Sequence, residues 1–288
     1  MKKSFFIPDT LKKYYKLTGI NHNTLLSVNP KINKNSISTY GVHLAPHTIS
    51  GFNLCPMALN CSKICLHAAG VPYMYDNKLK ARINKSLAFN ADSNLFLITV
   101  LINLLKHYKN NNYDFIGLRL NLTSDIQYEN FSIDIDTSIK LFIYERFNIN
   151  IDLGKYDNIF RLIIDNGLKI ICYDYTKIYR RDNFKYCKSL NYKIAYSYDG
   201  YNNKLVRLNC LKAFDNGLNI AACIDYKKNE TLPRMFYSHH LNKEFKLIDG
   251  DKTDSIFNYD LFSLIGLRFK LPHAFKYSSL DKENFILR

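Results

Sequence analysis

Two stretches with one plan decide the fold: IDNGLKIICYD covers residues 164–174, and FDNGLNIAACID covers residues 214–225. In both, a helical segment ends at Asn-Gly, where glycine can take the left-handed conformation that closes a helix. An apolar strand follows directly. Helix, glycine stop and buried strand form the repeating unit of a parallel sheet. The sequence therefore predicts an α/β fold.

Further apolar stretches extend this pattern along the chain. Strands are expected at residues 115–121, 193–198, 245–249 and 264–269, and residues 148–153 alternate like another strand. No G-x-G-x-x-G fingerprint is present, so we expect a parallel (β/α) barrel, complete or incomplete, rather than an open Rossmann sheet. No boundary rich in Pro, Gly or Ser divides residues 40–288, which we interpret as one domain behind a basic N-terminal arm, residues 1–39.

Two helices are expected between the first strand and residue 115. In residues 77–90, Leu79, Ile83 and Leu87 recur at helical spacing and predict an amphipathic helix with this apolar face inward. The next helix begins at an Asp92/Ser93 cap and runs to Leu105. Because it is apolar nearly all round, we expect it to be buried.

A cysteine-rich loop follows the first expected strand: residues 40–70 read YGVHLAPHTISGFNLCPMALNCSKICLHAAG. Cys55, Cys61 and Cys65 have the spacing C-x5-C-x3-C. Three thiolates on one loop can converge on a metal ion or an iron–sulfur cluster. Two alternatives stay open, a redox pair and inert thiols. An odd total of seven cysteines does not suit a disulfide framework, so we favour metal binding.

The spacing leaves the identity of the metal open. A closed zinc site needs a fourth ligand, which His67 or His47 could supply. Three cysteines alone suit a four-iron cluster with one open iron. In this respect the loop resembles that of radical S-adenosylmethionine enzymes, although their usual spacing is C-x3-C-x2-C. That resemblance implies a partial (β/α) barrel and S-adenosylmethionine as a cofactor.

Composition limits the partners. No apolar run reaches membrane-spanning length, and Pro8, Asp9 and Lys12 interrupt any export signal, so we expect an intracellular protein without a membrane partner. The net charge of +15 is compatible with nucleic-acid binding through a basic surface. An A/T-rich genome would produce the same lysine-rich composition, so this partner stays open, as does the oligomeric state.

Polar side chains gather where the expected strands end. Parallel strands place their carboxyl ends at one edge, where (β/α) barrels hold their chemistry. Capping of the following helices would explain each residue singly, but the set together with the cysteine loop favours a site. Candidate catalytic residues are Arg119, Asn121, Ser124, Asp125, Lys177, Asp249 and Asp251, and candidate cofactor-binding residues are Tyr175 and Ser197.

An ordered series of blocks resembles the phage and plasmid "gene product eighty-eight" family. The blocks are LAPHTISGFNLCPMALNCSKICLHAAG, ARINKS, RLNLTSD, YDYTK, AYS, IDGDKTD and GLRFK, spread over residues 40–270. The resemblance implies a phage or mobile-element origin, hence a place inside the host cell, and supports the candidate residues as motif positions. His67 falls where this family does not lead us to expect histidine, which weakens it as a ligand.

Three functions are compatible with these residues. We favour an enzyme in which the cysteines hold an iron–sulfur cluster or zinc, Arg119 and Lys177 bind a phosphate-bearing or nucleic-acid substrate, and the aspartates act as acid, base or metal ligands. The alternative is a non-catalytic replication or DNA-binding factor with a structural zinc site. A metal-dependent nuclease using the carboxylates of DGDKTD, residues 249–254, is the third.

Overall fold

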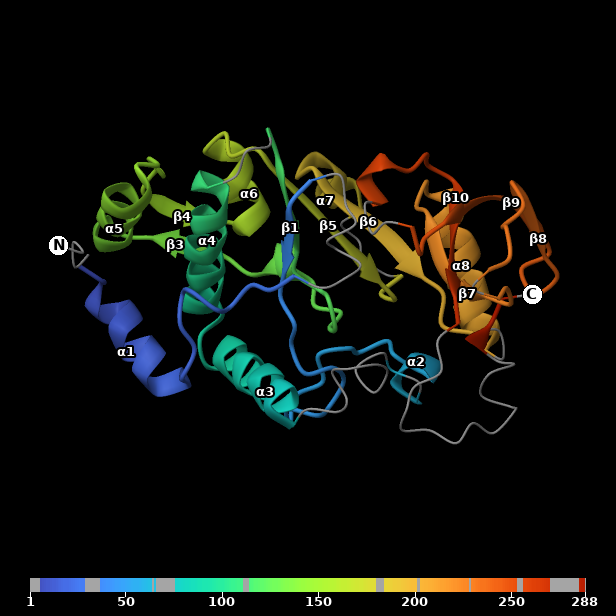
Figure 1. Ribbon diagram of the computed structural model, residues 1–288, viewed down its shortest axis with the longest axis horizontal. Coiled ribbons are helices and arrows are strands. Elements are labelled where there is room, and N and C mark those ends of the chain that lie inside the picture. Colours follow the sequence, from blue (N-terminus) through green and yellow to red (C-terminus); the bar gives the residue numbers. More distant parts are fainter. Residues whose placement is uncertain are drawn as a thin grey trace.

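Eight strands build the main sheet in the order β1-β2-β5-β6-β7-β10-β9-β8 (Figure 1). The computed structural model describes residues 6–28, 37–63, 65, 76–110, 114–179, 184–200, 203–227, 229–252, 256–269 and 285–287. The strands are β1 (Thr39–Gly41), β2 (Ile116–Arg119), β5 (Ile170–Thr176), β6 (Tyr192–Ser197), β7 (Ile220–Ile224), β8 (Met235–Ser238), β9 (Lys243–Asp249) and β10 (Ser263–Arg268). Each neighbouring pair from β1 to β9 is parallel, and β8 pairs antiparallel with β9. The predicted α/β class is confirmed.

Closure into a barrel is not shown. Within the described ranges, β1 and β8 are the two edge strands and do not pair with each other. The strand order gives the physical reason, since β10 returns to lie between β7 and β9. A barrel winds its consecutive strands side by side around one axis. This insertion and the antiparallel edge strand β8 produce an open sheet instead.

Helices occupy most of the connections between the strands. They are α1 (Asp9–Thr18), α2 (Asn60–Lys63), α3 (Asp76–Ala91), α4 (Ser93–Lys109), α5 (Thr137–Phe147), α6 (Ile159–Asp165), α7 (Phe184–Ser189) and α8 (Lys204–Asp215). Two 3-10 turns, η4 (Tyr128–Asn130) and η5 (Ile256–Asn258), and a small antiparallel hairpin of β3 (Ile133–Ile135) and β4 (Gly154–Tyr156) complete the described part. None of the helices in these ranges is long and apolar enough to cross a membrane.

The two repeated stretches fold as predicted. Helix α6 leads into β5, and α8 leads into β7. Gly167 and Gly217 follow the two helices with φ of 63° and 87°, a conformation that costs a side-chain-bearing residue free energy. The amide of Leu168 donates to the carbonyl of Ile163 at 3.0 Å, which is the bond that closes a helix at a left-handed glycine.

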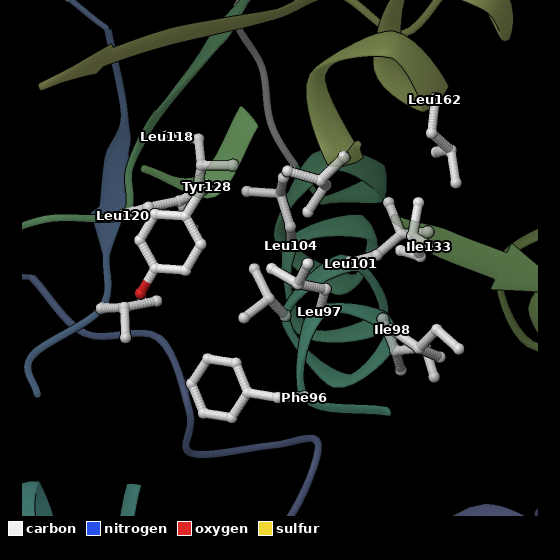
Figure 2. Packing of buried hydrophobic residues seen from close by; sticks show 14 of the residues in the cluster. Phe96, Leu97, Ile98, Leu101, Leu104, Leu118, Leu120, Tyr128, Ile133 and Leu162 are labelled. Atoms are coloured by element: carbon white, nitrogen blue, oxygen red, sulfur yellow. The ribbon is translucent and has the colours of Figure 1, made fainter. Parts of the chain in front are cut away.

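Helix α4 is the centre of the larger hydrophobic core. The side chain of Asp92 caps it by accepting from the amide of Leu95 at 2.8 Å, and every residue from Phe96 to Leu105 is buried. Figure 2 shows Leu97, Leu101 and Leu104 among side chains from the sheet, from η4 and from α6. The prediction of a capped, buried helix is confirmed.

The basic N-terminal segment packs on the same core over the part that the structure describes. Leu11 and Tyr14 of α1 are buried in the core, and the hydroxyl of Tyr14 donates to the carbonyl of Ala88 on α3 at 2.9 Å. Leu25 and Leu26 follow them into the core. Residues 6–28 therefore lie against the domain as a packed segment.

Helix α3 exists as predicted, but its apolar stripe is only partly buried. Leu79 and Ile83 are half-buried and Leu87 is 45% exposed, whereas Ser86, Ala88 and Phe89 are buried. The hydroxyl of Ser86 accepts from the amide of Ala45 at 2.9 Å. This polar contact with the segment after β1 places Ser86 inward at the end of the helix where the stripe predicted Leu87.

The strand expected at residues 148–153 is also wrong. Asn148 ends α5 in the left-handed conformation, with φ of 56°, and the strand is β4, which begins at Gly154. Ile151 is fully buried in the core without joining a sheet. Burial of the alternating isoleucines, rather than strand pairing, explains the sequence pattern.

The two faces of the sheet have different cover. Helices and their apolar side chains pack on one face of the strands. On the other face, Tyr173, Ala195, Ala221 and Ile265 pack with Ile256 of η5. Side chains alternate between the faces along each strand.

Candidate functional site

The carboxyl ends of β1, β2, β5 and β6 lie side by side, because these strands are parallel neighbours. The segment after β1 carries the three cysteines, and α2 lies beyond this edge of the sheet (Figure 1). The loops after β2, β5 and β6 open at the same edge. The topology therefore places the cysteine loop at the same edge of the sheet as these loops, as the sequence predicted.

Cys55 is held by backbone groups on both sides. Its sulfur accepts from the amide of His47 at 3.3 Å and lies 3.9 Å from the carbonyl oxygen of Thr123 in the loop after β2. His47 adopts a left-handed conformation with φ of 52°, which is unusual for a residue with a side chain. Such strain is concentrated at functional sites.

Asp199, directly after β6, anchors the second cysteine. Its two carboxylate oxygens accept from the amides of Cys61 at 2.6 Å and Leu59 at 2.7 Å, and its carbonyl accepts from the side chain of Asn60 at 2.8 Å. Asp199 is buried. This residue thereby fixes the start of α2, and with it Cys61, to the edge of the sheet.

Lys177 connects the loops after β2 and β5 to the end of β6. Its ammonium donates to the hydroxyl of Ser197 at 2.6 Å, and its amide donates to Asp125 at 2.8 Å. Burial alone would lower the pKa of this ammonium, but the charges of Cys61, Asp199 and Asp125 outweigh it, and the pKa is raised above its ordinary value. These neighbours favour the charged form of Lys177 beside Cys61.

The three thiols lie close enough together to affect one another's pKa. Burial raises the pKa of Cys55 to about 12 and that of Cys61 to about 11, and the charge of Cys65 adds to both increases. All three are free thiols of intermediate exposure. Within the described ranges, no three His, Cys, Asp or Glu side chains are already arranged to hold a metal ion. His67 lies outside the described residues. We call Cys55, Cys61 and Cys65 the thiol site.

Arg119 pairs within the sheet. Its Nε lies 3.7 Å from Oδ1 of Asp174 on the neighbouring strand β5, and its guanidinium stacks 4.6 Å from the ring centre of Tyr175. Asp174 is fully buried and also accepts from the hydroxyl of Tyr192 at 2.8 Å. The partner predicted from the sequence was a loop carboxylate, Asp125, Asp249 or Asp251. Strand pairing supplies Asp174 instead.

Asn121 and Ser124 shape the loop after β2. The amide oxygen of Asn121 accepts from the hydroxyl of Ser124 and from the amide of Ile126, both at 2.9 Å. Its side-chain nitrogen donates to the carbonyl of Ile126 at 2.8 Å. These bonds close the loop on itself and present Asp125 to Lys177. A structural role therefore explains both residues.

Asp249 and Asp251 belong to another cluster. They hold the guanidinium of Arg268 at 2.9 and 3.6 Å, and the amide of Arg268 donates to Asp251 at 2.8 Å. Their strand, β9, is separated from β2 by β5, β6, β7 and β10. At ~4.8 Å per strand this is roughly 24 Å. The prediction that these carboxylates join Arg119 in one site is wrong, because β10 and β7 come between.

Two groups that border the thiol site were not among the candidate site residues. Asp199 was noted as a polar residue after an expected strand but was given no role. The other group is cationic: Arg82 and Lys85 on α3 face inward with His43. The block ARINKS contains both cations, but the expected leucine face pointed them toward solvent.

Comparison with known proteins gives one match. A family model described as "Gene product 88" matches residues 11–270. The match covers the thiol site, Asp199 and Arg82, and it begins inside the basic N-terminal segment. No curated protein and no solved structure matches the chain.

Proposed function

The chain belongs to the gene product 88 family, and we propose that it is a phage or mobile-element enzyme acting inside the host cell. In this proposal Cys55, Cys61 and Cys65 hold an iron–sulfur cluster, with zinc as the alternative, and a phosphate-bearing substrate binds beside it. The observation that supports it is the grouping of three thiols at the carboxyl edge of parallel strands, with the buried ammonium of Lys177 beside Cys61. Such sheets carry their sites at this edge.

The donor set fits a thiophilic cation. A metal ion displaces the thiol protons, so it offsets the raised pKa values that burial imposes on Cys55 and Cys61. The amide of His47 already points at the Cys55 sulfur, and hydrogen bonds of this kind stabilise ligated thiolates. Binding would require the three sulfurs to move into a common ligand geometry, since the described residues are not already arranged in one.

Three cysteines leave one iron of a four-iron cluster open to a small ligand, for which S-adenosylmethionine is one candidate. The residues of this chain would then supply charge and proton transfer around it. Lys177 balances the negative charge of the thiolates, and Ser197 holds its ammonium in place. Asp125 is the acid–base candidate, since the amide of Lys177 orients its carboxylate.

A non-catalytic DNA-binding factor with structural zinc is the second candidate. It is favoured by the outer face of α1, where Lys12, Lys13 and Lys16 are exposed while Leu11 and Tyr14 anchor the helix. Binding through such a face should weaken steeply with salt, because neutralised phosphates release counterions. Neutralising the three lysines should then reduce both the affinity and the salt dependence.

Metal and acid-labile sulfide in anaerobically purified protein test the proposal. We expect iron with sulfide in the wild type and neither in the triple Cys→Ser variant of the thiol site. Cys223→Ser is the matched control, since Cys223 is a thiol of similar exposure on β7 outside the site, and it should retain the metal. Zinc without sulfide would support the second candidate. A folded wild type that takes up neither metal on reconstitution would contradict both.

A further inference from the structure

Within the described part of the chain, the guanidinium of Arg82 makes no hydrogen bond and no ion pair. Its main-chain carbonyl accepts from the hydroxyl of Ser86 at 3.0 Å. The residue is half-buried, and burial lowers the pKa of its guanidinium, an effect that the charge of Cys65 opposes. Partial burial of a cation without compensating hydrogen bonds is costly. The guanidinium nitrogens of Arg82 are not among the buried atoms that lack a partner, so a ligand can reach them.

The surroundings of Arg82 are fixed by hydrogen bonds between three segments. Lys85, one turn along α3, donates its ammonium to the carbonyl of Leu25 at 2.8 Å. His43, two residues after β1, shares its Nδ1 with the hydroxyl of Ser27 at 2.9 Å. The amide of Val42 donates to the carbonyl of Arg119 at 3.0 Å. These bonds hold α3 and the segment after β1 at the carboxyl end of β2.

The charges at this place are one-sided. Burial lowers the pKa of His43 to about 3, and the neighbouring cations Arg82, Lys85 and Arg119 add to the decrease. Burial and then Arg82 lower the pKa of Lys85 to about 8. Arg119 has its carboxylate, Asp174, inside the sheet. Arg82 and Lys85 thus concentrate positive charge beside the Cys65 thiol.

We propose that Arg82 and Lys85, with His43 beside them, bind the phosphate group of a small ligand next to Cys65. The guanidinium fork matches a phosphate with two parallel hydrogen bonds, and the ammonium adds a third charged donor. Two neighbouring cations favour a dianionic phosphate over a single carboxylate. The inference deepens the proposed function, because it identifies which end of the substrate this side of the thiol site receives.

This assignment replaces the anion-binding roles expected for Arg119 and Lys177. Lys177 is balanced by Asp125 and Asp199, and Arg119 is paired and stacked. Neither needs an external anion. Among the cations that the structure describes near the thiol site, Arg82 has donors left for a ligand.

Titration of the full chain with inorganic phosphate, at constant ionic strength, tests the assignment by calorimetry and by the melting temperature. Acetate serves as the monoanionic carboxylate probe. We expect phosphate to bind and to raise the melting temperature, acetate to bind at least about tenfold more weakly, and Arg82→Gln to weaken phosphate binding by about tenfold or more. Lys80→Gln, an equal loss of charge on the exposed side of α3, should leave the affinity within about twofold.

Two outcomes would overturn the proposal. One is phosphate binding that is equal in the wild type and in Arg82→Gln. The other is a folded wild type that binds no phosphate at a concentration of about 50 mM. Arg82→Gln should fold, since within the described residues the guanidinium makes no hydrogen bond or ion pair that the variant loses. Its melting temperature without phosphate should equal or exceed that of the wild type. Arg82→Lys, which keeps the charge but not the fork, should bind with intermediate affinity.

The test separates this site from the metal. The triple Cys→Ser variant of the thiol site is titrated in parallel, and metal content is measured on every sample. Phosphate binding that persists in this variant keeps the Arg82 site even if no metal is found in the wild type. If Arg82→Gln keeps both its metal and the wild-type affinity for phosphate, the Arg82 site is overturned. The metal proposal is not affected by that result.

Discussion

Replacing Asp199 by asparagine should loosen the start of α2, because this carboxylate holds two amides of the cysteine loop. Its oxygens accept from Cys61 at 2.6 Å and from Leu59 at 2.7 Å. Asparagine keeps one acceptor and turns an NH2 group toward the other amide. One charge-assisted hydrogen bond is therefore lost, which amounts to ~1.5–3 kcal/mol. If the lost free energy destabilises the closed loop relative to its locally open form, the fraction of molecules with an open loop rises roughly 10- to 150-fold.

Alkylation of the metal-free protein under native conditions measures this opening. The rate at which iodoacetamide modifies Cys61, followed by peptide mass spectrometry, should rise in Asp199→Asn by the same factor as the open fraction. Cys223 on β7 is the internal standard, and its rate should not change. Asp215→Asn is the matched control, because Asp215 is an exposed carboxylate at the end of α8, paired with Lys243 at 3.0 Å.

Two results would refute the reasoning. An unchanged rate at Cys61 would mean that the Asp199 bonds do not hold the loop closed. An equal rise at Cys61 and Cys223 would mean that the variant unfolds as a whole, so that Asp199 acts on the fold and not on the loop.

The other predictions concern the core, the acid response and the second cluster. Leu104→Ala should lower the free energy of unfolding by ~2–5 kcal/mol in urea titrations because Leu104 is fully buried, whereas exposed Leu205→Ala should change it by less than about 0.5 kcal/mol. Burial, and then the neighbouring guanidinium of Arg146, lower the pKa of His22 to about 4, below its unfolded value near 6.5. The stability that the neutral form contributes is therefore complete above pH 6.5 and is lost as the pH falls toward 4. His22→Gln should make the urea midpoint less dependent on pH over this window. Arg268→Leu should destabilise the protein, since it leaves Asp249 unpaired, but metal content should stay at the wild-type level; loss of metal in this variant would place the second cluster in the site after all.

Local features of the sequence were sufficient for several elements. The Asn-Gly ends of α6 and α8, the aspartate cap of α4 and the apolar strands after each glycine all depend on residues within about five positions of one another. Capping and hydrophobic periodicity act over such short distances, so they can be recognised before the fold is known. The same holds for the parallel α/β class, which follows from the alternation of these units.

The inner face of α3 shows where local patterns fail. Apolar residues at helical spacing predicted one inner face, but Leu87 at the end of that stripe is exposed. Ser86 and Lys85 bond to Ala45 and Leu25 there instead. These partners lie 41 and 60 residues away along the chain. A periodicity count sees apolar residues and does not see a polar contact made by a distant segment.

The sequence by itself determined the secondary structure units, the buried helix α4 and the three neighbouring thiols. Only the tertiary structure decided what surrounds those thiols: Asp199 reaches Cys61 across 138 residues, and Lys177 reaches Ser197 across 20. The insertion of β10 between β7 and β9 removed Asp249 from the site. The physical reason is that side chains meet according to the order of strands in the sheet. That order is set by the packing of the whole core, and no stretch of the sequence contains it.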